Sequence, residues 1–210
     1  MAPGHVAYGL SAQYGLPVTP ETVIAWERGD RSPTSAELTA LAGVLWCSPG
    51  ELLARATTLR EHRIASGLAA DELARRVGMD ASSYLRMEES GRWKGNERQS
   101  AALAEVLALS LPEFVTATGK DEALADVLRN AVTTRWQAYL RPLSKMLPVP
   151  KHHLEDILEQ LHTDYQSRMV ATLSWGGGGG QAGSGDAGRE FLAGIVARFW
   201  DLARGTERDY

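Results

Sequence analysis

Apolar residues recur every three or four positions along most of the chain, in short runs that stop at glycines. One run carries Leu73 and Val77 and stops at Gly78, and the next run stops at Gly91. Glycine directly after an apolar run is a common helix end, because it takes the left-handed conformation without steric cost. Two short helices joined at Gly78 are typical of a helix-turn-helix. No segment alternates apolar and polar residues with period two, so the pattern predicts an all-α fold.

The pattern occurs twice, which indicates a tandem repeat. Three separated segments of the first copy match three of the second: LSAQYG (10–15) with LARRVG (73–78), VIAWERG (23–29) with YLRMEESG (84–91), and LAGVLWCSPGELL (41–53) with LAEVLALSLPEFV (103–115). Each copy closes with an S-x-x-E capping box, which begins at Ser48 in the first and at Ser110 in the second. The first copy has no counterpart of the helix that precedes LARRVG in the second, so either the chain has lost that helix or its natural start lies upstream. We therefore expect its exposed apolar surface to pack against the second repeat or the C-terminal segment.

The order LARRVG, SSYLRME and LAEVLALSLPEF resembles the Cro/C1-type (XRE-like) helix-turn-helix family of transcriptional regulators. The resemblance implies two tandem lambda-repressor-like bundles, each with a third helix that reads the DNA major groove. Residues 1–57 would form the first repeat, without its first helix, and residues 58–119 a complete five-helix second repeat. Family members often begin the second helix with Thr-Gln, where this chain has Ala69 and Ala70, so one backbone anchor to DNA is in doubt.

Longer helices are predicted after Gly119, at 121–139, 151–175 and 189–204, with a glycine-rich linker at 176–188. Residues 120–210 would form a helical C-terminal domain that dimerises, binds an effector, or does both. The segment LLARATTLREHR between the repeats contains no proline or glycine, so it reads as a near-continuous helix that couples them rigidly.

The third helix of the second repeat carries the candidate DNA-reading residues. In the family that the chain resembles, Tyr84 and Met87 would face the bundle core. Four residues then remain on the outer face: Ser82, Ser83, Leu85 and Arg86. Arginine can make a bidentate contact to guanine, serine can hydrogen-bond to several bases, and leucine can touch the thymine methyl group. Basic residues before and after this helix are candidate phosphate contacts: Arg75, Arg76, Arg92, Lys94 and Arg98.

The first repeat offers a poorer reading face, with Thr22, Arg28 and Arg31 as its candidate DNA contacts. Glu21 at the front of the same helix would repel phosphate, although a glutamate can accept a hydrogen bond from cytosine. A second DNA reader and a structural support therefore both remain open for this repeat.

Several residues suggest other chemistry at first sight. Glu27 and Glu88 lie near the C-terminal end of each third helix, where the helix dipole disfavours a carboxylate, so each needs a donor such as Arg28, Arg31 or Arg92. We interpret both as structural rather than catalytic. GSGDAG at 183–188 fits a dinucleotide fingerprint, but no β-strand is predicted before it, so a linker is favoured. We predict no catalytic residue, no cofactor and no metal site.

Charge and cysteine content limit which functions and which cell compartment are expected. A net charge of −4 argues against a general nucleic-acid coat, but allows a reader whose basic residues share one face. The single cysteine cannot form an intramolecular disulfide, and neither a signal peptide nor a membrane-spanning stretch is evident, so a cytoplasmic location is expected. Only four of the 22 basic residues are lysines, which suggests a GC-rich bacterial genome such as that of an actinobacterium.

These observations favour a sequence-specific transcriptional regulator that binds double-stranded DNA through the second repeat. It would form a homodimer through the C-terminal helices. The alternative is a module that keeps the helix-turn-helix bundle but binds a protein partner, for example a sigma factor or an antagonist. The acidic balance of the first repeat favours that alternative.

Overall fold

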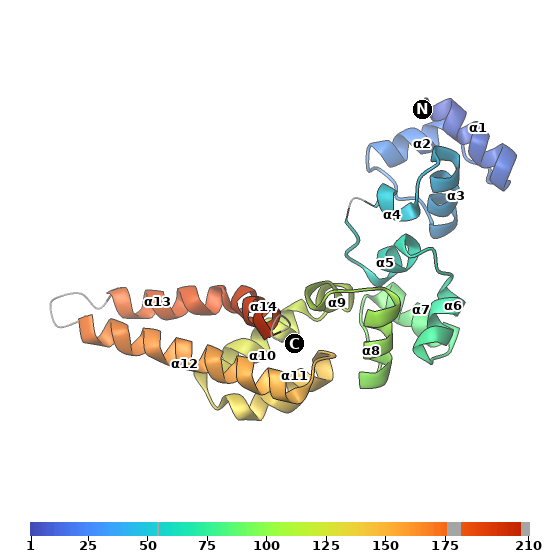
Figure 1. Ribbon diagram of the computed structural model, residues 1–210. Coiled ribbons are helices and arrows are strands. Elements are labelled where there is room, and N and C mark those ends of the chain that lie inside the picture. Colours follow the sequence, from blue (N-terminus) through green and yellow to red (C-terminus); the bar gives the residue numbers. More distant parts are fainter. Residues whose placement is uncertain (54, 176–181, 207–210) are drawn as a thin grey trace. The chain divides into compact units, whose positions relative to one another are not determined.

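The computed structural model describes residues 1–53, 55–175 and 182–206. Over these ranges all regular structure is helical, as helices α1 to α14 and one 3-10 helix, so the predicted all-α fold is confirmed (Figure 1). The chain divides into two compact units, Met1–Gly91 and Arg92–Tyr210. The repeat boundaries at residues 57 and 119 remain predictions from the sequence.

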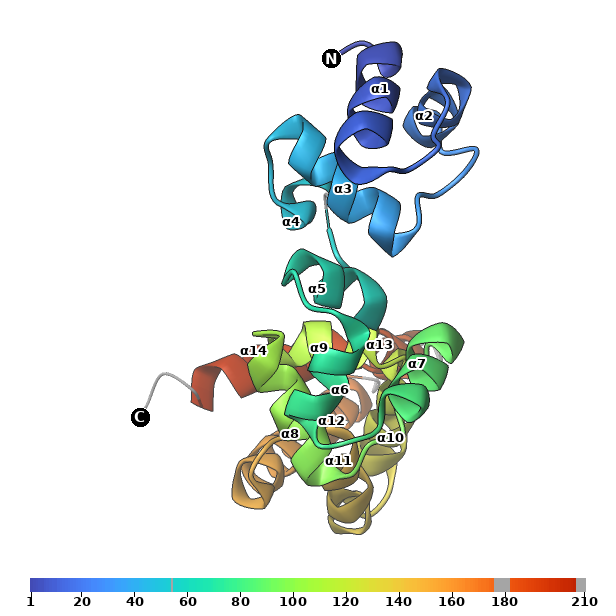
Figure 2. The same ribbon diagram turned by 90° about the vertical axis from the view of Figure 1, so that its right-hand side faces the viewer.

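The first four helices of the first unit lie within residues 1–57, the predicted first repeat. The seven helices of the unit are α1 (Pro3–Tyr14), α2 (Pro20–Glu27), α3 (Ser35–Leu45), α4 (Pro49–Leu52), α5 (Leu59–Ala65), α6 (Ala70–Val77) and α7 (Ala81–Ser90). Helix α1 lies beside α2 and crosses α3 (Figure 2). At this crossing a Cβ atom on Gly9 would lie 2.8 Å from Cγ1 of Val44, so glycine permits the close approach. Around it the first repeat builds a small core of Val6, Ala7, Leu10, Val23, Ala40 and Val44.

Helix ends follow the local signals in the sequence. Helix α6 ends at Gly78 and α7 at Gly91, with φ angles of 77° and 63° in the left-handed region. Helix α2 begins with Pro20 directly after Thr19, whose hydroxyl accepts a hydrogen bond from the Thr22 amide. The helix ends predicted at Gly78 and Gly91 are confirmed.

The backbone repeats as the sequence does. Trp46 and Ala108 are the non-glycine residues with positive φ in the described part of the chain, at 57° and 49°. They occupy equivalent positions of the two repeats, Trp46 after α3 and Ala108 after α8. Each is followed two residues later by a complete capping box, at Ser48 and at Ser110. Trp46 is 93% exposed. Both repeats therefore have a residue in the left-handed conformation at this helix end.

The continuous helix predicted between the repeats is wrong. Helix α4 ends at Leu52, and α5 begins only at Leu59. The reason is a capping box in which the Thr58 side chain accepts from the Glu61 amide, while the Glu61 carboxylate accepts from the Thr57 and Thr58 amides. Threonine hydroxyls therefore start a new helix at a place where no proline or glycine marks a break.

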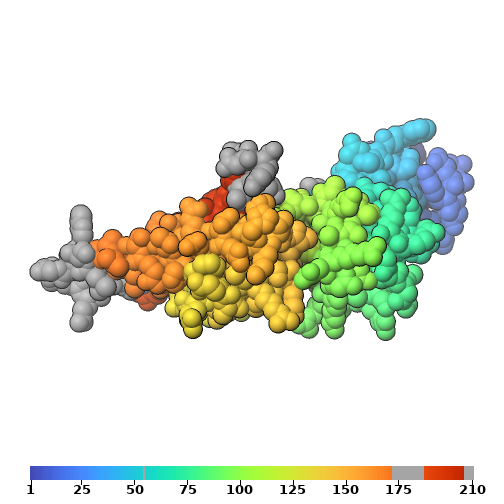
Figure 3. Space-filling model, turned by 60° about the horizontal axis from the view of Figure 1, so that its bottom comes forward, coloured from blue at the N-terminus to red at the C-terminus, as the bar shows by residue number. Residues whose placement is uncertain are grey.

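The second unit contains the remaining helices. They are α8 (Glu97–Val106), α9 (Leu111–Ala117), α10 (Asp121–Thr133), the 3-10 helix η1 (Trp136–Tyr139), α11 (Leu140–Met146), α12 (Lys151–Trp175), α13 (Ala182–Ala193) and α14 (Ile195–Thr206). Helices α12 and α13 run side by side as an antiparallel pair (Figure 1). The hydrophobic core of the second unit includes Leu124, Leu128, Leu158, Phe191 and Phe199. In the space-filling view α10 and α11 (yellow) and α12 (orange) make one continuous surface (Figure 3).

Two helix predictions in this unit need correction. The helix predicted at 121–139 ends at Thr133, because Thr134 leaves the helical conformation, with φ −131° and ψ −130°. A separate 3-10 helix follows. In the linker predicted at 176–188, residues 176–181 lie outside the described residues, but 182–188 belong to α13. A Cβ atom on Gly188 would lie 3.0 Å from the Met169 sulfur, so the glycine lets α13 pack closely on α12.

The helix predicted at 189–204 is divided between α13 and α14 at Gly194. Among the described residues no single helix is both long and apolar enough to cross a membrane. The pair α8 and α9, bent by 110°, meets that test only when the two helices are taken together.

Candidate nucleic-acid interface

The helix-turn-helix of the second repeat consists of α6 and α7. Helix α6 buries Leu73, Ala74 and Val77 on one face, and α7 buries Tyr84, so the two helices pack against each other across the turn at Gly78. The N-terminal end of α6 has no side-chain cap, because Ala69 occupies the capping position. This agrees with the departure from the family pattern noted in the sequence.

A buried ion pair ties α7 to α5. Arg63 of α5 donates through Nε and Nη2 to the two carboxylate oxygens of Glu88, each at 2.8 Å, and through Nη1 to the Leu68 carbonyl at 2.9 Å. The two side chains are 8% and 5% exposed. The hydroxyl of Tyr84 is buried beside this pair. Such a bidentate pair fixes both the position and the rotation of α7 relative to α5.

This pair corrects one sequence expectation. The donor for Glu88 was expected among Arg28, Arg31 and Arg92, whereas the structure supplies Arg63, which lies 25 residues away in sequence. Glu27, the equivalent carboxylate of the first repeat, is exposed, and its side chain makes no ion pair or hydrogen bond among the described residues. The two glutamates therefore occupy matching positions with different surroundings.

The predicted reading face of α7 points outward. Ser82, Leu85 and Arg86 are exposed, and Ser83 is half-buried. Leu85 is 39% exposed, which is high for a large aliphatic residue on a packed helix. Tyr84 is fully buried and Met87 half-buried, as expected from the sequence. The outer face therefore combines polar groups, one apolar group and one cation, all within the first unit.

Hydrogen bonds already organise this face. The Asp80 carboxylate caps α7: it accepts from the Ser83 amide at 2.9 Å and from the Ser82 hydroxyl at 2.6 Å. Hydrogen bonds from Ser82 and then Ser83 hold the pKa of the Asp80 carboxyl well below its ordinary value, so it is charged at neutral pH. Arg86 Nη2 donates to the Ser83 hydroxyl at 3.1 Å. A base contacted by Ser82, Ser83 or Arg86 would have to replace or share these bonds.

Asp80 is a residue of this face that the sequence analysis did not identify. It places an exposed negative charge at the front of the candidate reading helix, beside residues expected to meet DNA. The signal was present in the sequence, because an aspartate directly before the apolar-periodic segment 81–89 is a standard helix N-cap.

Two arginines of α6 lie on its exposed side. Arg75 makes no ion pair or hydrogen bond through its side chain among the described residues, whereas Arg76 Nη2 lies 2.5 Å from Glu72 Oε1 in an i, i+4 pair. Both could reach a phosphate, but Arg76 would have to leave or share Glu72. Arg75 could therefore bind a phosphate without giving up an ion pair, whereas Arg76 could not.

The other predicted phosphate contacts belong to the second unit. Arg92, Lys94 and Arg98 are all exposed. The segment that carries them is anchored by Trp93, whose indole Nε1 donates to the Ser100 hydroxyl at 2.9 Å and whose amide donates to the Thr118 carbonyl at 3.3 Å. Because Trp93 is buried, its neighbours on both sides are held at the surface.

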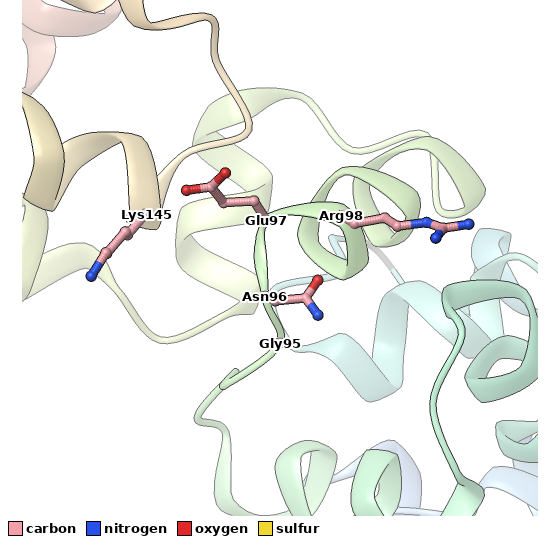
Figure 4. A pocket seen from close by; sticks show the side chains of 5 residues that line it. All are labelled: Gly95, Asn96, Glu97, Arg98 and Lys145. Carbon is pink, nitrogen blue, oxygen red and sulfur yellow. The ribbon is translucent and has the colours of Figure 1, made fainter.

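A shallow pocket lies next to this segment, at the start of α8. It is lined by Gly95, Asn96, Glu97, Arg98 and Lys145. Figure 4 shows that the Arg98 side chain points away from Lys145 and Glu97. Asn96 is engaged in the capping box of α8, where its side chain accepts from the Gln99 amide. The pocket thus lacks a convergent set of cations for an anionic ligand. No group of metal-ligating side chains is found in the ranges that the structure describes.

The first repeat presents a smaller reading face on α2. Thr22 is half-buried, and its hydroxyl lies 3.2 Å from that of Thr19. Arg28 and Arg31 are exposed beyond the end of the helix, while Glu21 is exposed at its start. The arrangement agrees with the sequence pattern and leaves the cations of this repeat away from the front of α2.

Comparison with known proteins concerns mainly the second repeat. Residues 54–115 match the family model of a helix-turn-helix domain. No curated protein and no solved structure matches the chain. The match covers α5 to α8 and most of α9, the helices that the sequence pattern assigned to one bundle. This segment of the chain is therefore similar to a helix-turn-helix domain.

Proposed function

We propose that the protein is a sequence-specific DNA-binding regulator of transcription, of the Cro/C1 (XRE-like) type, in which α7 enters the major groove. The observation that carries the proposal is the exposed face of Ser82, Leu85 and Arg86 on the second helix of a helix-turn-helix. That helix is held at its far end by the buried pair of Arg63 and Glu88. Arg86 would read guanine and Leu85 the thymine methyl group.

Phosphate contacts would position this helix on the duplex. Arg75 and Arg76 precede α7, and Arg92, Lys94 and Arg98 follow it. Thr22, Arg28 and Arg31 would add contacts if the first repeat also meets DNA. Residues 58–119 contain nearly equal numbers of acidic and basic side chains. Tight binding would therefore require two copies of the chain on one site, joined through the helices of residues 120–210.

The experiment is selection of binding sites from random duplexes at low salt, with the full chain. Enrichment of one motif supports the proposal, and a palindromic motif with a fixed half-site spacing supports the dimer. Recovery of unenriched sequences, together with no salt-dependent binding to any duplex, would refute DNA reading.

A second candidate is a protein-interaction module that keeps the same bundle. Two observations favour it: α6 has no side-chain cap at Ala69, and Glu21 is exposed at the front of α2. The partner would be a protein of the transcription machinery, such as a sigma factor or its antagonist. A stoichiometric protein complex in the absence of DNA binding would decide for this candidate.

A further inference from the structure

Arg86, the cation of the candidate reading face, is held by a neutral group. Its Nη2 donates to the hydroxyl of Ser83, three residues earlier in α7, at 3.1 Å. Its side chain forms no ion pair in the part of the chain that the structure describes, although Glu89 follows three residues later. The hydroxyl therefore orients the guanidinium group without compensating its charge.

Arg76 of α6 shows the opposite arrangement. Its Nη2 lies 2.5 Å from a carboxylate oxygen of Glu72, so an acidic side chain of the protein already compensates its charge. A ligand of Arg76 competes with that carboxylate, whereas a ligand of Arg86 meets an uncompensated cation. Of the two arginines, Arg86 is thus the better prepared for a strong charge-assisted contact.

The contact with Ser83 also leaves a two-point donor edge on Arg86. A guanidinium group has five N–H donors, and Nη2 supplies two of them. The Ser83 oxygen accepts from one, so two adjacent donors remain on one edge, either Nη1 with Nη2 or Nε with Nη2. Two adjacent donors are what a bidentate contact to O6 and N7 of guanine requires.

Ser83 is itself fixed at the start of α7. Its amide donates to the Asp80 carboxylate at 2.9 Å, and the residue is half-buried, whereas Ser82 and Arg86 are exposed. The position of the Ser83 oxygen is therefore set by the helix cap. A long side chain held in one orientation before binding loses less conformational entropy when it binds.

We propose that Ser83 is a positioning residue for Arg86: its hydroxyl holds the guanidinium group in the orientation that selects guanine, and Ser83 contacts no base itself. This role rests on the proposed function of α7 and extends it. The sequence suggested Ser83 as a direct DNA contact, but its oxygen already accepts from Arg86. Base preference at one position of the DNA site would then depend on two residues, of which only one touches DNA.

The test is a double-variant cycle with the full chain. The probes are the duplex motif that the wild type enriches from random sequences and the same duplex with its guanines replaced one at a time. Anisotropy titrations should show that Ser83→Ala weakens binding to the motif by roughly two- to tenfold, the cost of ordering one long side chain. The preference for one guanine should fall as well. In the Arg86→Ala background, Ser83→Ala should change neither quantity.

Two further variants separate positioning from a general effect on the fold. Ser83→Thr keeps a hydroxyl at the same place and should restore both the affinity and the guanine preference. Ser82→Ala removes the neighbouring hydroxyl, which donates to Asp80, and should leave the preference at the guanine read by Arg86 unchanged. Thermal unfolding followed by circular dichroism should show that all variants fold, because the helix cap uses the amide of Ser83 and not its side chain.

The outcomes distinguish this role from the proposed function. If Ser83→Ala weakens binding by the same factor with and without Arg86, the serine contacts DNA directly and the positioning role is wrong. If the wild type enriches a motif but Ser83→Ala binds it with unchanged affinity and guanine preference, the positioning role is overturned and DNA reading by α7 stands. If no motif is enriched and no duplex is bound, both are refuted.

Discussion

Arg63 and Glu88 form a two-point contact in the interior of the second repeat, with both N–O distances at 2.8 Å. The contact joins the first helix of the bundle to the helix proposed to read DNA. Because the two side chains are only 8% and 5% exposed, loss of one partner would leave a largely buried charge without compensation. The stability of the bundle and the placement of its reading face therefore depend on the same pair.

Arg63→Ala should lower the free energy of unfolding by about 3–5 kcal/mol, the range for breaking a buried pair. Urea denaturation followed by circular dichroism measures this loss. The double variant Arg63→Met with Glu88→Leu removes both charges and should recover most of the stability. A loss well under 1 kcal/mol in the single variant would mean that water reaches Glu88.

The free energy of unfolding should fall in acid, because protonation of Glu88 removes its charge. Burial raises the pKa of Glu88, but the hydrogen bonds and the charge of Arg63, together with the nearby Tyr84 hydroxyl, lower it more, so it lies below the ordinary value of 4.5. A carboxyl with a depressed folded-state pKa stabilises the fold above its unfolded pKa, and this stability is lost as the pH falls through the folded value.

Glu88→Gln should therefore be less stable than the wild type at neutral pH and show a flatter stability profile below pH of about 4.5, the ordinary value. Urea unfolding at a series of pH values provides the measurement. The capping glutamates Glu37, Glu51 and Glu61 also have lowered pKa values and give a background that both proteins share. Parallel profiles for the two proteins would contradict the role of Glu88.

Asp80 should restrain DNA binding while it stabilises α7. Asp80→Asn keeps a side-chain oxygen that can accept from the Ser83 amide but removes the charge, so binding to any duplex should tighten. Asp80→Ala also removes the cap and should lower the melting temperature. Anisotropy titrations at several salt concentrations, paired with thermal melts, separate the two effects. If Asp80→Asn binds DNA more weakly, the carboxylate contacts a base and does not oppose phosphate.

Arg86 and Arg75 should affect DNA binding in different ways. Arg86→Ala should cost about 1–3 kcal/mol of binding free energy and relax the preference at one base position. Arg75→Ala should weaken binding to all sequences and reduce the slope of log K against log salt by about one. Arg76→Ala should have a smaller effect than Arg75→Ala, because Glu72 already holds Arg76. Equal salt slopes for all three variants and the wild type would argue against phosphate contacts on α6.

Gly95→Ala should disturb the segment that carries Arg92 and Lys94. The added Cβ atom would lie 2.3 Å from Cζ2 and 2.5 Å from Cε2 of the Trp93 ring, which is buried and hydrogen-bonded to Ser100. We expect a loss of about 1–3 kcal/mol in unfolding free energy, as for other overpacked sites. Gly4→Ala is the matched control, because a Cβ atom there meets nothing within 4 Å. Equal stability of the two variants would show that the Trp93 ring can move.

Local signals explain what the sequence predicted well. Caps and left-handed glycines act within one helical turn, so the ends of α6 and α7 and the start of α2 could be placed from neighbouring residues alone. The outward face of α7 followed from the helical period once Tyr84 was assigned to the core. Fold class, the helix-turn-helix and the exposure of the candidate reading face could therefore be predicted from the sequence.

Contacts between distant residues explain what the sequence did not predict. Gly188 reads as part of a glycine-rich linker until α12 brings Met169 against it. Nothing in the local sequence distinguishes Arg63 from an exposed arginine, and only the folded bundle brings it into contact with Glu88. In both cases the decisive neighbour is many residues away, and a single sequence carries no marker of that pairing.

Trp46 and Ala108 allow the same backbone position to be compared in two repeats of one molecule. Both residues adopt the left-handed conformation at the same place in the repeat, yet one is a large exposed indole and the other a methyl group. The backbone geometry is common to both sites, so replacing each by glycine would relieve the same conformational strain in two settings. Any difference between the two responses would report on what the indole does, free of the backbone contribution. The substitution at Ala108 thus serves as the control for the substitution at Trp46.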